Sequence, residues 1–194
     1  CEGLVVVQVS VAVVAVVSTT FVVVPVGCGV ELGPEDRLSP GEYAEVLRRF
    51  FRLAEGAEFE TRATCAPQSG RILAEAEGRT AEPSAAGGRP SGCLAGSGIV
   101  FVSHRGEVFP CGYLPVRCGS VRERPLSAVW RESEVLARLR RRDELLEGVC
   151  GACPWRTSCG GCRARAFAAT GRLLATDPGC PYGGETRAEE KKNR

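Results

Sequence analysis

Three kinds of residue are scarce in this chain of 194 residues: methionine is absent, histidine occurs once, and aromatic residues make up 6%. The net charge is only +2, so no strong electrostatic field surrounds the protein. Nucleic-acid binding needs a basic surface and stacking aromatic rings, and this composition supplies neither. Because the chain starts at Cys1 and holds no initiator methionine, we expect it to be part of a longer protein.

Cysteine is plentiful, and its distribution argues against a disulfide scaffold. There are 11 cysteines, an odd number, and no cleavable signal segment with a basic start is present. Most of them cluster in the second half, as metal ligands do, so we expect a reducing, cytoplasmic location. The length suits one medium domain, or a small domain attached to a fragment of a larger one.

An uncharged segment, residues 4–26, contains 13 valines. A membrane span is one interpretation, because about 20 apolar residues cross a bilayer. The valine content, the interspersed polar residues and the missing basic flank favour instead two buried strands of a parallel sheet. We therefore predict an α/β layer and no contact with a membrane.

A helix is predicted after this region. Residues 39–42 read Ser-Pro-Gly-Glu, a capping box with proline at the first helical position, and apolar residues then recur at helical spacing until Gly56. A short strand is expected over residues 59–64. The first eighty residues thus indicate strand, helix and strand, which is part of an α/β unit.

Residues 81–92 are rich in proline, glycine and alanine, a composition typical of a linker. Beyond them, the apolar runs 99–102 and 107–109 flank a short turn that contains Gly106. This arrangement predicts a β-hairpin.

Helical spacing of apolar residues returns over residues 126–146, with a break near Ser133. A further helix is expected from Arg163 to Thr170, ended by Gly171. The charged segment 184–194 is expected to be a disordered tail.

Seven cysteines of the second half form one ordered pattern. They are Cys93, Cys111, Cys150, Cys153, Cys159, Cys162 and Cys180. Cys150 and Cys153 set two thiolates on one turn, and Cys159 follows after five residues. Cys180 precedes a proline, as a remote cluster ligand does in small ferredoxins, and can supply a fourth thiolate. An iron–sulfur cluster fits this set, and structural zinc, which also uses C-x2-C pairs, is the alternative.

Taken whole, the spacing is C-x12-G-x4-C, a gap of 38 residues, C-x2-C-x5-C-x2-C, a gap of 17 residues and a last cysteine. This pattern resembles the SPASM domain, the auxiliary-cluster module of many radical S-adenosylmethionine (SAM) enzymes. The common pattern has three residues before the sixth cysteine where this chain has two, and a subgroup with the shorter form exists. The sequences around the cysteines, 92–96, 101–108, 110–115 and 159–166, are similar to the radical SAM enzymes of heme d1 formation and of the siroheme-dependent alternative heme pathway.

The resemblance implies an α/β fold in which residues 1–80 are the C-terminal strands and helix of a partial (β/α) radical SAM barrel. The linker 81–92 would join them to a small, cysteine-rich α+β SPASM domain, residues 93–183. The C-x3-C-x2-C triplet that binds the SAM-cleaving cluster does not occur in this sequence. The resemblance therefore places SAM cleavage in the longer parent protein, and enzymatic activity of this chain itself stays open.

The same resemblance assigns the cluster ligands. One auxiliary 4Fe-4S cluster would be held by Cys150, Cys153, Cys159 and Cys180. A second would take Cys93, Cys111 and Cys162, and its fourth ligand in two-cluster relatives lies shortly before the position of Cys93. No cysteine occurs there in this chain. Either Cys65 or Cys118 completes this site, or the cluster keeps an open iron for substrate, or it does not form.

A siroheme-derived tetrapyrrole with modified carboxylate side chains is the substrate that the resemblance implies, with a ferredoxin or flavodoxin as electron donor. Arg163 and Arg165 are the candidate carboxylate-binding residues, because a guanidinium pairs bidentately with a carboxylate. Helix-surface charges are the plainer interpretation of both, and His104 is expected to be exposed in the hairpin turn. No catalytic residue is identified. The alternative functions are a maturase of a peptide or of another metal cofactor, and a non-enzymatic zinc-binding module.

Overall fold

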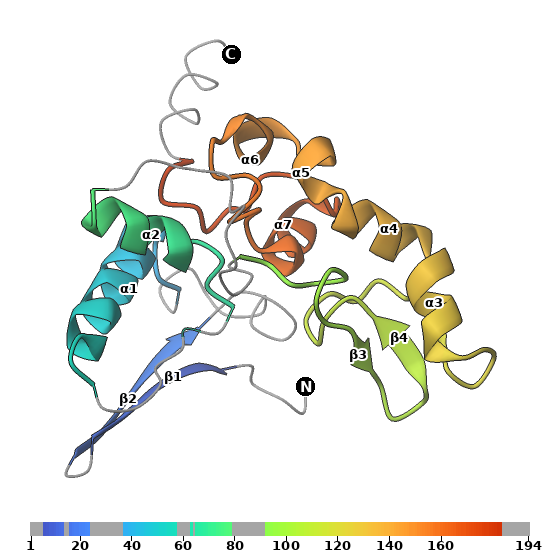
Figure 1. The fold of residues 1–194 in the computed structure, drawn as a ribbon, viewed down its shortest axis with the longest axis horizontal. Helices are drawn as coiled ribbons and strands as arrows, with labels where there is room; N and C mark the ends of the chain where they lie inside the picture. Colours follow the sequence, from blue (N-terminus) through green and yellow to red (C-terminus); the bar gives the residue numbers. More distant parts are fainter. Residues whose placement is uncertain are drawn as a thin grey trace.

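The computed structural model describes residues 6–13, 16–23, 37–57, 63, 65–78 and 92–183 (Figure 1). The predicted linker, apart from Gly92, and the predicted tail lie outside the described residues, as does most of the strand expected over 59–64. The described part is a mixture of helices and two small sheets. A partial barrel therefore remains a prediction, whereas the α and β content expected for the chain is present.

The valine-rich segment forms two strands, β1 (Val6–Val13) and β2 (Val16–Val23). They pair antiparallel, with Val6 opposite Val23 and Val13 opposite Val16. The expectation of a parallel sheet is thus wrong. Only two residues separate the strands, whereas a parallel pair needs a crossover of a dozen residues or more. No helix within the described ranges is long and apolar enough to cross a membrane.

Helix α1 (Pro40–Ala54) begins at the predicted capping box. The Glu42 amide donates to Ser39 Oγ at 3.2 Å, and the Ser39 amide donates to the Glu42 carboxylate at 2.8 Å. A second helix, α2 (Ser69–Ala76), was not predicted from the sequence. It packs against α1 through a core formed by Tyr43, Ala44, Leu47, Ala66 and Ile72.

The predicted hairpin is confirmed as β3 (Phe101–Val102) and β4 (Glu107–Phe109), which pair antiparallel. Gly106 has a φ of 80° at the turn, a conformation that favours glycine. A third strand, β5 (Gly119–Ser120), pairs with β4 on its other side.

Five short helices complete the fold, two of them joined at Ser133. They are α3 (Leu126–Glu132), α4 (Glu134–Arg140), α5 (Arg142–Leu145), α6 (Gly148–Ala152) and α7 (Arg163–Thr170). The predicted break is confirmed, because Ser133 ends α3 and its hydroxyl accepts from the Leu136 amide to cap α4. The predicted end of α7 is also confirmed, with Gly171 left-handed at a φ of 70°.

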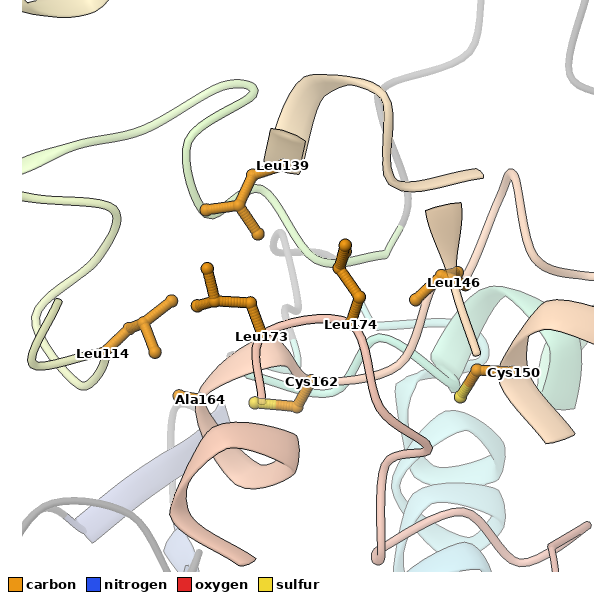
Figure 2. Packing of buried hydrophobic residues seen from close by; sticks show 8 residues of the cluster. All are labelled: Leu114, Leu139, Leu146, Cys150, Cys162, Ala164, Leu173 and Leu174. Atoms are coloured by element: carbon orange, nitrogen blue, oxygen red, sulfur yellow. The ribbon is translucent and has the colours of Figure 1, made fainter. Parts of the chain in front are cut away.

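Two cores organise the part after residue 92. One lies between the three-stranded sheet and α3 and α4, and consists of Val108, Cys118, Val129 and Leu136. The other joins the loop after β4 to α4, α6 and α7 (Figure 2) and consists of Leu114, Leu139, Leu146, Cys150, Cys162, Ala164, Leu173 and Leu174. Figure 2 shows Cys150 and Cys162 among the leucines of this second core, so predicted ligands are part of the packing that holds the fold together.

Candidate metal centre

A cavity of about 400 Å³ is lined by the four cysteines of the first predicted ligand set. Cys150 lies in α6, Cys153 directly follows that helix, Cys159 lies in the loop that leads to α7, and Cys180 lies in the last described loop. Gln68, Arg71, Trp155 and Tyr182 contribute to the remaining wall. Segments far apart in the sequence therefore direct thiols to one space.

Among the residues that the structure describes, no three Cys, His, Asp or Glu side chains form a ready site for a single metal ion. A 4Fe-4S cluster makes a different demand, because four Cys thiolates hold a four-iron object and therefore surround a volume. The cavity is lined by four cysteines, which is the number of thiolates that such a cluster needs.

Backbone amides are directed at two of the sulfurs. The Asp177 amide donates to Cys150 Sγ at 3.4 Å, and the Gly161 amide donates to Cys159 Sγ at 3.4 Å. Gly161 has a φ of 59°, and a Cβ atom there would lie 2.7 Å from Arg163 Nη2 and 3.2 Å from Cys150 Sγ. The Gly160-Gly161 pair thus permits a tight turn that a larger residue would obstruct.

Two arginines reach sulfur atoms of the same set. Arg163 Nη2 lies 3.8 Å from Cys150 Sγ, and Arg71 Nη1 lies 3.8 Å from Cys153 Sγ. Guanidinium N–H groups donate hydrogen bonds to sulfur as well as to oxygen. The site therefore combines amide and guanidinium donors around its thiols.

Burial raises the pKa of two of these thiols, Cys159 and Cys180. It raises the pKa of Cys159 to about 12, the Gly161 amide opposes this, and the neighbouring Asp177, Cys180 and Cys150 add to it. Burial likewise raises the pKa of Cys180, to which Cys150 and Cys153 also contribute. The thiols lie close enough to affect one another. As ligands of a cluster they would be thiolates, because a positive metal centre would take the place of their protons.

A second group of thiols lies beside the first. The Cys93 amide donates to the Cys159 carbonyl at 3.2 Å, and Cys65 and Cys111 pack against the core that contains Cys162. Burial raises the pKa of Cys65, and Cys111 and Cys93 raise it further. Burial also raises the pKa of Cys162 to about 12, with Cys93 among the contributing neighbours. The three predicted ligands and Cys65 therefore form one neighbourhood.

Cys65 and Cys118, left as alternatives by the sequence, lie in different surroundings. Cys65 has a φ of 55° and is the one non-glycine residue with positive φ in the described part of the chain. Such a conformation is costly and is often found at functional sites. Cys118 lies in the core beneath the small sheet, and its thiol donates to the Val116 carbonyl at 3.5 Å. The geometry groups Cys65, and not Cys118, with Cys93 and Cys111.

Arg163 and Arg165 are buried, with 0% and 3% of their surfaces exposed, so their interpretation as helix-surface charges is wrong. Arg163 Nη1 donates to the Leu173 and Ala175 carbonyls at 3.1 and 2.7 Å. Arg165 pairs with Asp177 at 2.7 Å and donates to Gln68 Oε1 at 3.1 Å. Both guanidinium groups are therefore used within the protein. The sequence of α7 contains no pattern that predicts the burial of these two arginines.

Asp177 and Gln68 belong to the site but were not predicted from the sequence. The Asp177 carboxylate accepts from Gln68 Nε2 at 2.8 Å, from the Cys162 amide at 2.7 Å and from the Gly179 amide at 3.0 Å. One carboxylate thus links the residue that precedes α2, the second thiol group and the loop that carries Cys180. His104 is exposed, as predicted.

The chain is similar to known proteins over most of its length. Residues 93–154 match the SPASM family, an iron–sulfur cluster-binding domain. The chain is 42% identical to an AdoMet-dependent heme synthase of Methanosarcina barkeri over 87% of its own length and 48% of that protein. It is 40% identical to a pre-heme d1 synthase of Dinoroseobacter shibae over 46% of the chain and 23% of that protein. It is also 37% identical to a PqqA peptide cyclase of Xanthomonas oryzae over 47% of the chain and 26% of that protein.

The matches cover most of the chain but only part of each relative. The chain spans about half the length of the heme synthases it matches, 48% and 45% for the relatives from Methanosarcina barkeri and Nitratidesulfovibrio vulgaris. The SPASM match covers four of the seven predicted ligands and ends before Cys159. Residues 93–154 are thus similar to the SPASM iron–sulfur cluster-binding domain, and most of the chain is similar to part of the AdoMet-dependent heme synthases.

Proposed function

We propose that this chain binds an auxiliary 4Fe-4S cluster in the cavity lined by Cys150, Cys153, Cys159 and Cys180. The observation that carries the proposal is the convergence of these four thiols, from separate segments, on one space. The donor set fits the group, because 4Fe-4S clusters are held by four Cys thiolates. When bound, such a cluster accepts and donates single electrons. The protein's part is to hold the thiolates, direct N–H donors at sulfur and limit access of water.

We extend the proposal to a second cluster held by Cys93, Cys111 and Cys162, with Cys65 as the fourth ligand. Cys65 lies between α1 and α2 in the sequence, so this cluster would connect the part before the linker to the SPASM domain. The unusual backbone of Cys65 and its position beside the other thiols support this choice over Cys118.

For the whole protein, we propose the modification of carboxylate side chains on a siroheme-derived tetrapyrrole during heme or heme d1 formation. Support comes from the match to AdoMet-dependent heme synthases, which extends over 87% of the chain, whereas the match to a peptide cyclase extends over 47%. The radical step would belong to a C-x3-C-x2-C segment of the parent protein, with a ferredoxin or flavodoxin supplying electrons. The buried arginines of α7 have no part in the proposed recognition of substrate.

The test is iron and acid-labile sulfide per chain after anaerobic purification. One cluster predicts about four irons and two clusters about eight, with broad visible absorption. Cys153→Ala should lose about four irons, because an open ligand position weakens the first cluster. A colourless protein that holds zinc and no sulfide would overturn the proposal in favour of the zinc-binding module.

The second cluster is tested with a matched pair of variants. Cys65→Ser should lose about four irons relative to the wild type, whereas Cys118→Ser should keep them all, because Cys118 lies in a separate core. The assignment of Cys65 is contradicted if Cys118→Ser loses iron and Cys65→Ser does not. It is equally contradicted if the wild type holds about four irons and Cys65→Ser retains them.

A further inference from the structure

Arg71 reaches the proposed cluster cavity from outside the SPASM domain. It lies on α2, 82 residues before Cys153 in the sequence, and its Nη1 atom lies 3.8 Å from Cys153 Sγ. Its side chain is 18% exposed, and it lines the cavity. Part of the cavity wall is therefore formed by a cation from α2.

Other groups hold this guanidinium in place. Its Nε donates to Glu75 Oε1 at 2.7 Å, one helical turn further along α2. Its Cζ atom lies 3.2 Å from the centre of the Tyr182 ring, and the Tyr182 hydroxyl donates to the other oxygen of Glu75. The carboxylate and the ring fix two sides of the planar group, which leaves Nη1 directed at sulfur.

An ion pair alone does not account for this arrangement. A partly exposed Arg–Glu pair at i and i+4 contributes little to stability. Such a pair needs neither a stacked ring from the far end of the chain nor a position over a thiol. Tyr182 lies two residues after Cys180, so the stacking ties Arg71 to the loop that carries a predicted ligand.

We propose that Arg71 is a positioning and tuning residue that raises the reduction potential of the auxiliary cluster through its hydrogen bond to the Cys153 sulfur. The inference rests on the proposed cluster at Cys150, Cys153, Cys159 and Cys180. Reduction adds one negative charge to a cluster that is already anionic through its thiolates. A fixed cation and N–H donor at sulfur stabilises the reduced form more than the oxidised form.

Arg163 makes a comparable contact with Cys150 from the interior, but it also holds backbone carbonyls, so its replacement would disturb the fold. Arg71 is the testable member of the pair because it lies near the surface. Arg156 supplies a matched control: it lines the same cavity, is exposed, and lies three residues after Cys153. Its backbone amide donates to the Cys153 carbonyl at 3.1 Å, and no sulfur contact of its guanidinium is seen among the described residues.

The experiment is a redox titration followed by electron paramagnetic resonance, with iron measured on each sample. The relevant signal is the one that Cys153→Ala lacks. Arg71→Gln should shift its midpoint potential to a lower value, and Arg156→Gln should leave it at the wild-type value. Arg71→Lys should give a smaller shift, because an ammonium keeps the charge but cannot pair with Glu75 and sulfur in the same plane.

Tyr182→Phe should shift the potential in the same direction by less than Arg71→Gln, because the ring remains but Glu75 loses its phenol partner. If Arg71→Gln loses the cluster, the Lys and Phe variants decide the question. Equal potentials in Arg71→Gln and the wild type, or equal shifts in Arg71→Gln and Arg156→Gln, would overturn the inference while leaving the cluster in place. A wild-type chain without iron and sulfide would instead overturn the proposed function.

Discussion

At the scale of single residues, the most constrained group of the site is the Asp177 carboxylate. It is buried and accepts hydrogen bonds from the side chains of Arg165 and Gln68 and from the Cys162 amide. Burial by itself would raise its pKa, but the Arg165 guanidinium and the amide donors hold that pKa below the usual value. Asp177 is therefore ionised at neutral pH and balances the charge of Arg165.

Asp177→Asn should destabilise the protein by about 3–5 kcal/mol, because it leaves the Arg165 guanidinium buried without an anion. The measurement is the free energy of unfolding in denaturant, with the iron-loaded protein as the starting state. Asp143→Asn on α5 is the control and should change that free energy by less than about 0.5 kcal/mol. Equal effects of the two substitutions would show that the buried pair does not stabilise the fold.

At the same scale, the sequence predicted a set of thiols but not the polar side chains that contact it. The spacing of the cysteines predicted Cys150, Cys153, Cys159 and Cys180 as one set, whereas the set at Cys93 was predicted from the family resemblance. Gln68 and Asp177 are 109 residues apart, and neither stands in a local pattern that predicts their contact. The choice between Cys65 and Cys118 stayed open for the same reason, since it depends on how a distant loop returns to the domain.

At the scale of elements, two glycines with a left-handed backbone conformation flank α7, and their surroundings differ. Gly161 precedes the helix and leaves no room for a side chain beside Arg163, Asp177 and Cys150. Gly171 follows it, and a Cβ atom there would meet nothing within 4 Å. Gly161 is therefore needed for the close packing of the site, whereas Gly171 only ends the helix.

Gly171→Ala should cost about 1–2 kcal/mol through backbone strain alone and keep the full iron content. Gly161→Ala carries the same strain and in addition displaces the loop that directs its amide at Cys159, so it should lose about four irons. Iron analysis and thermal unfolding of both variants make the comparison. Full iron in Gly161→Ala would show that the turn tolerates a larger residue and that its amide is not needed.

Local signals explain which elements were predicted correctly. The start of α1 and the end of α7 each depend on a few adjacent residues, and both are confirmed. The valine-rich strands were predicted, but they were expected to be parallel. That prediction gave more weight to their valine content than to the short connection between them, which permits only an antiparallel pair. Helix α2 was missed because it has only eight residues and no side-chain cap.

At the scale of the whole molecule, two of the predicted cluster ligands are also part of the hydrophobic core. Cys150 and Cys162 belong to the core that joins α4, α6 and α7 (Figure 2). Metal binding in small domains supplies much of the folding free energy, because the ligand geometry does not exist in the unfolded chain. Loss of iron should therefore loosen this core before the separate core between α1 and α2.

Hydrogen exchange before and after anaerobic chelation measures this difference. Amides of α6 and α7 should exchange faster in the chelated protein, whereas amides of α1 should change little, because α1 packs through a core without predicted ligands. A uniform change over both regions would indicate one cooperative unit, and no change at α6 and α7 would show that the apo core is already complete.

Helix α2 forms one side of the cavity, and α2 lies outside the segment that the SPASM match covers. A fragment excised from residue 92 onward would keep every thiol of the first set and yet leave that set open to dioxygen along one flank. Air sensitivity measured on such a fragment would therefore describe the cut surface and not the intact molecule.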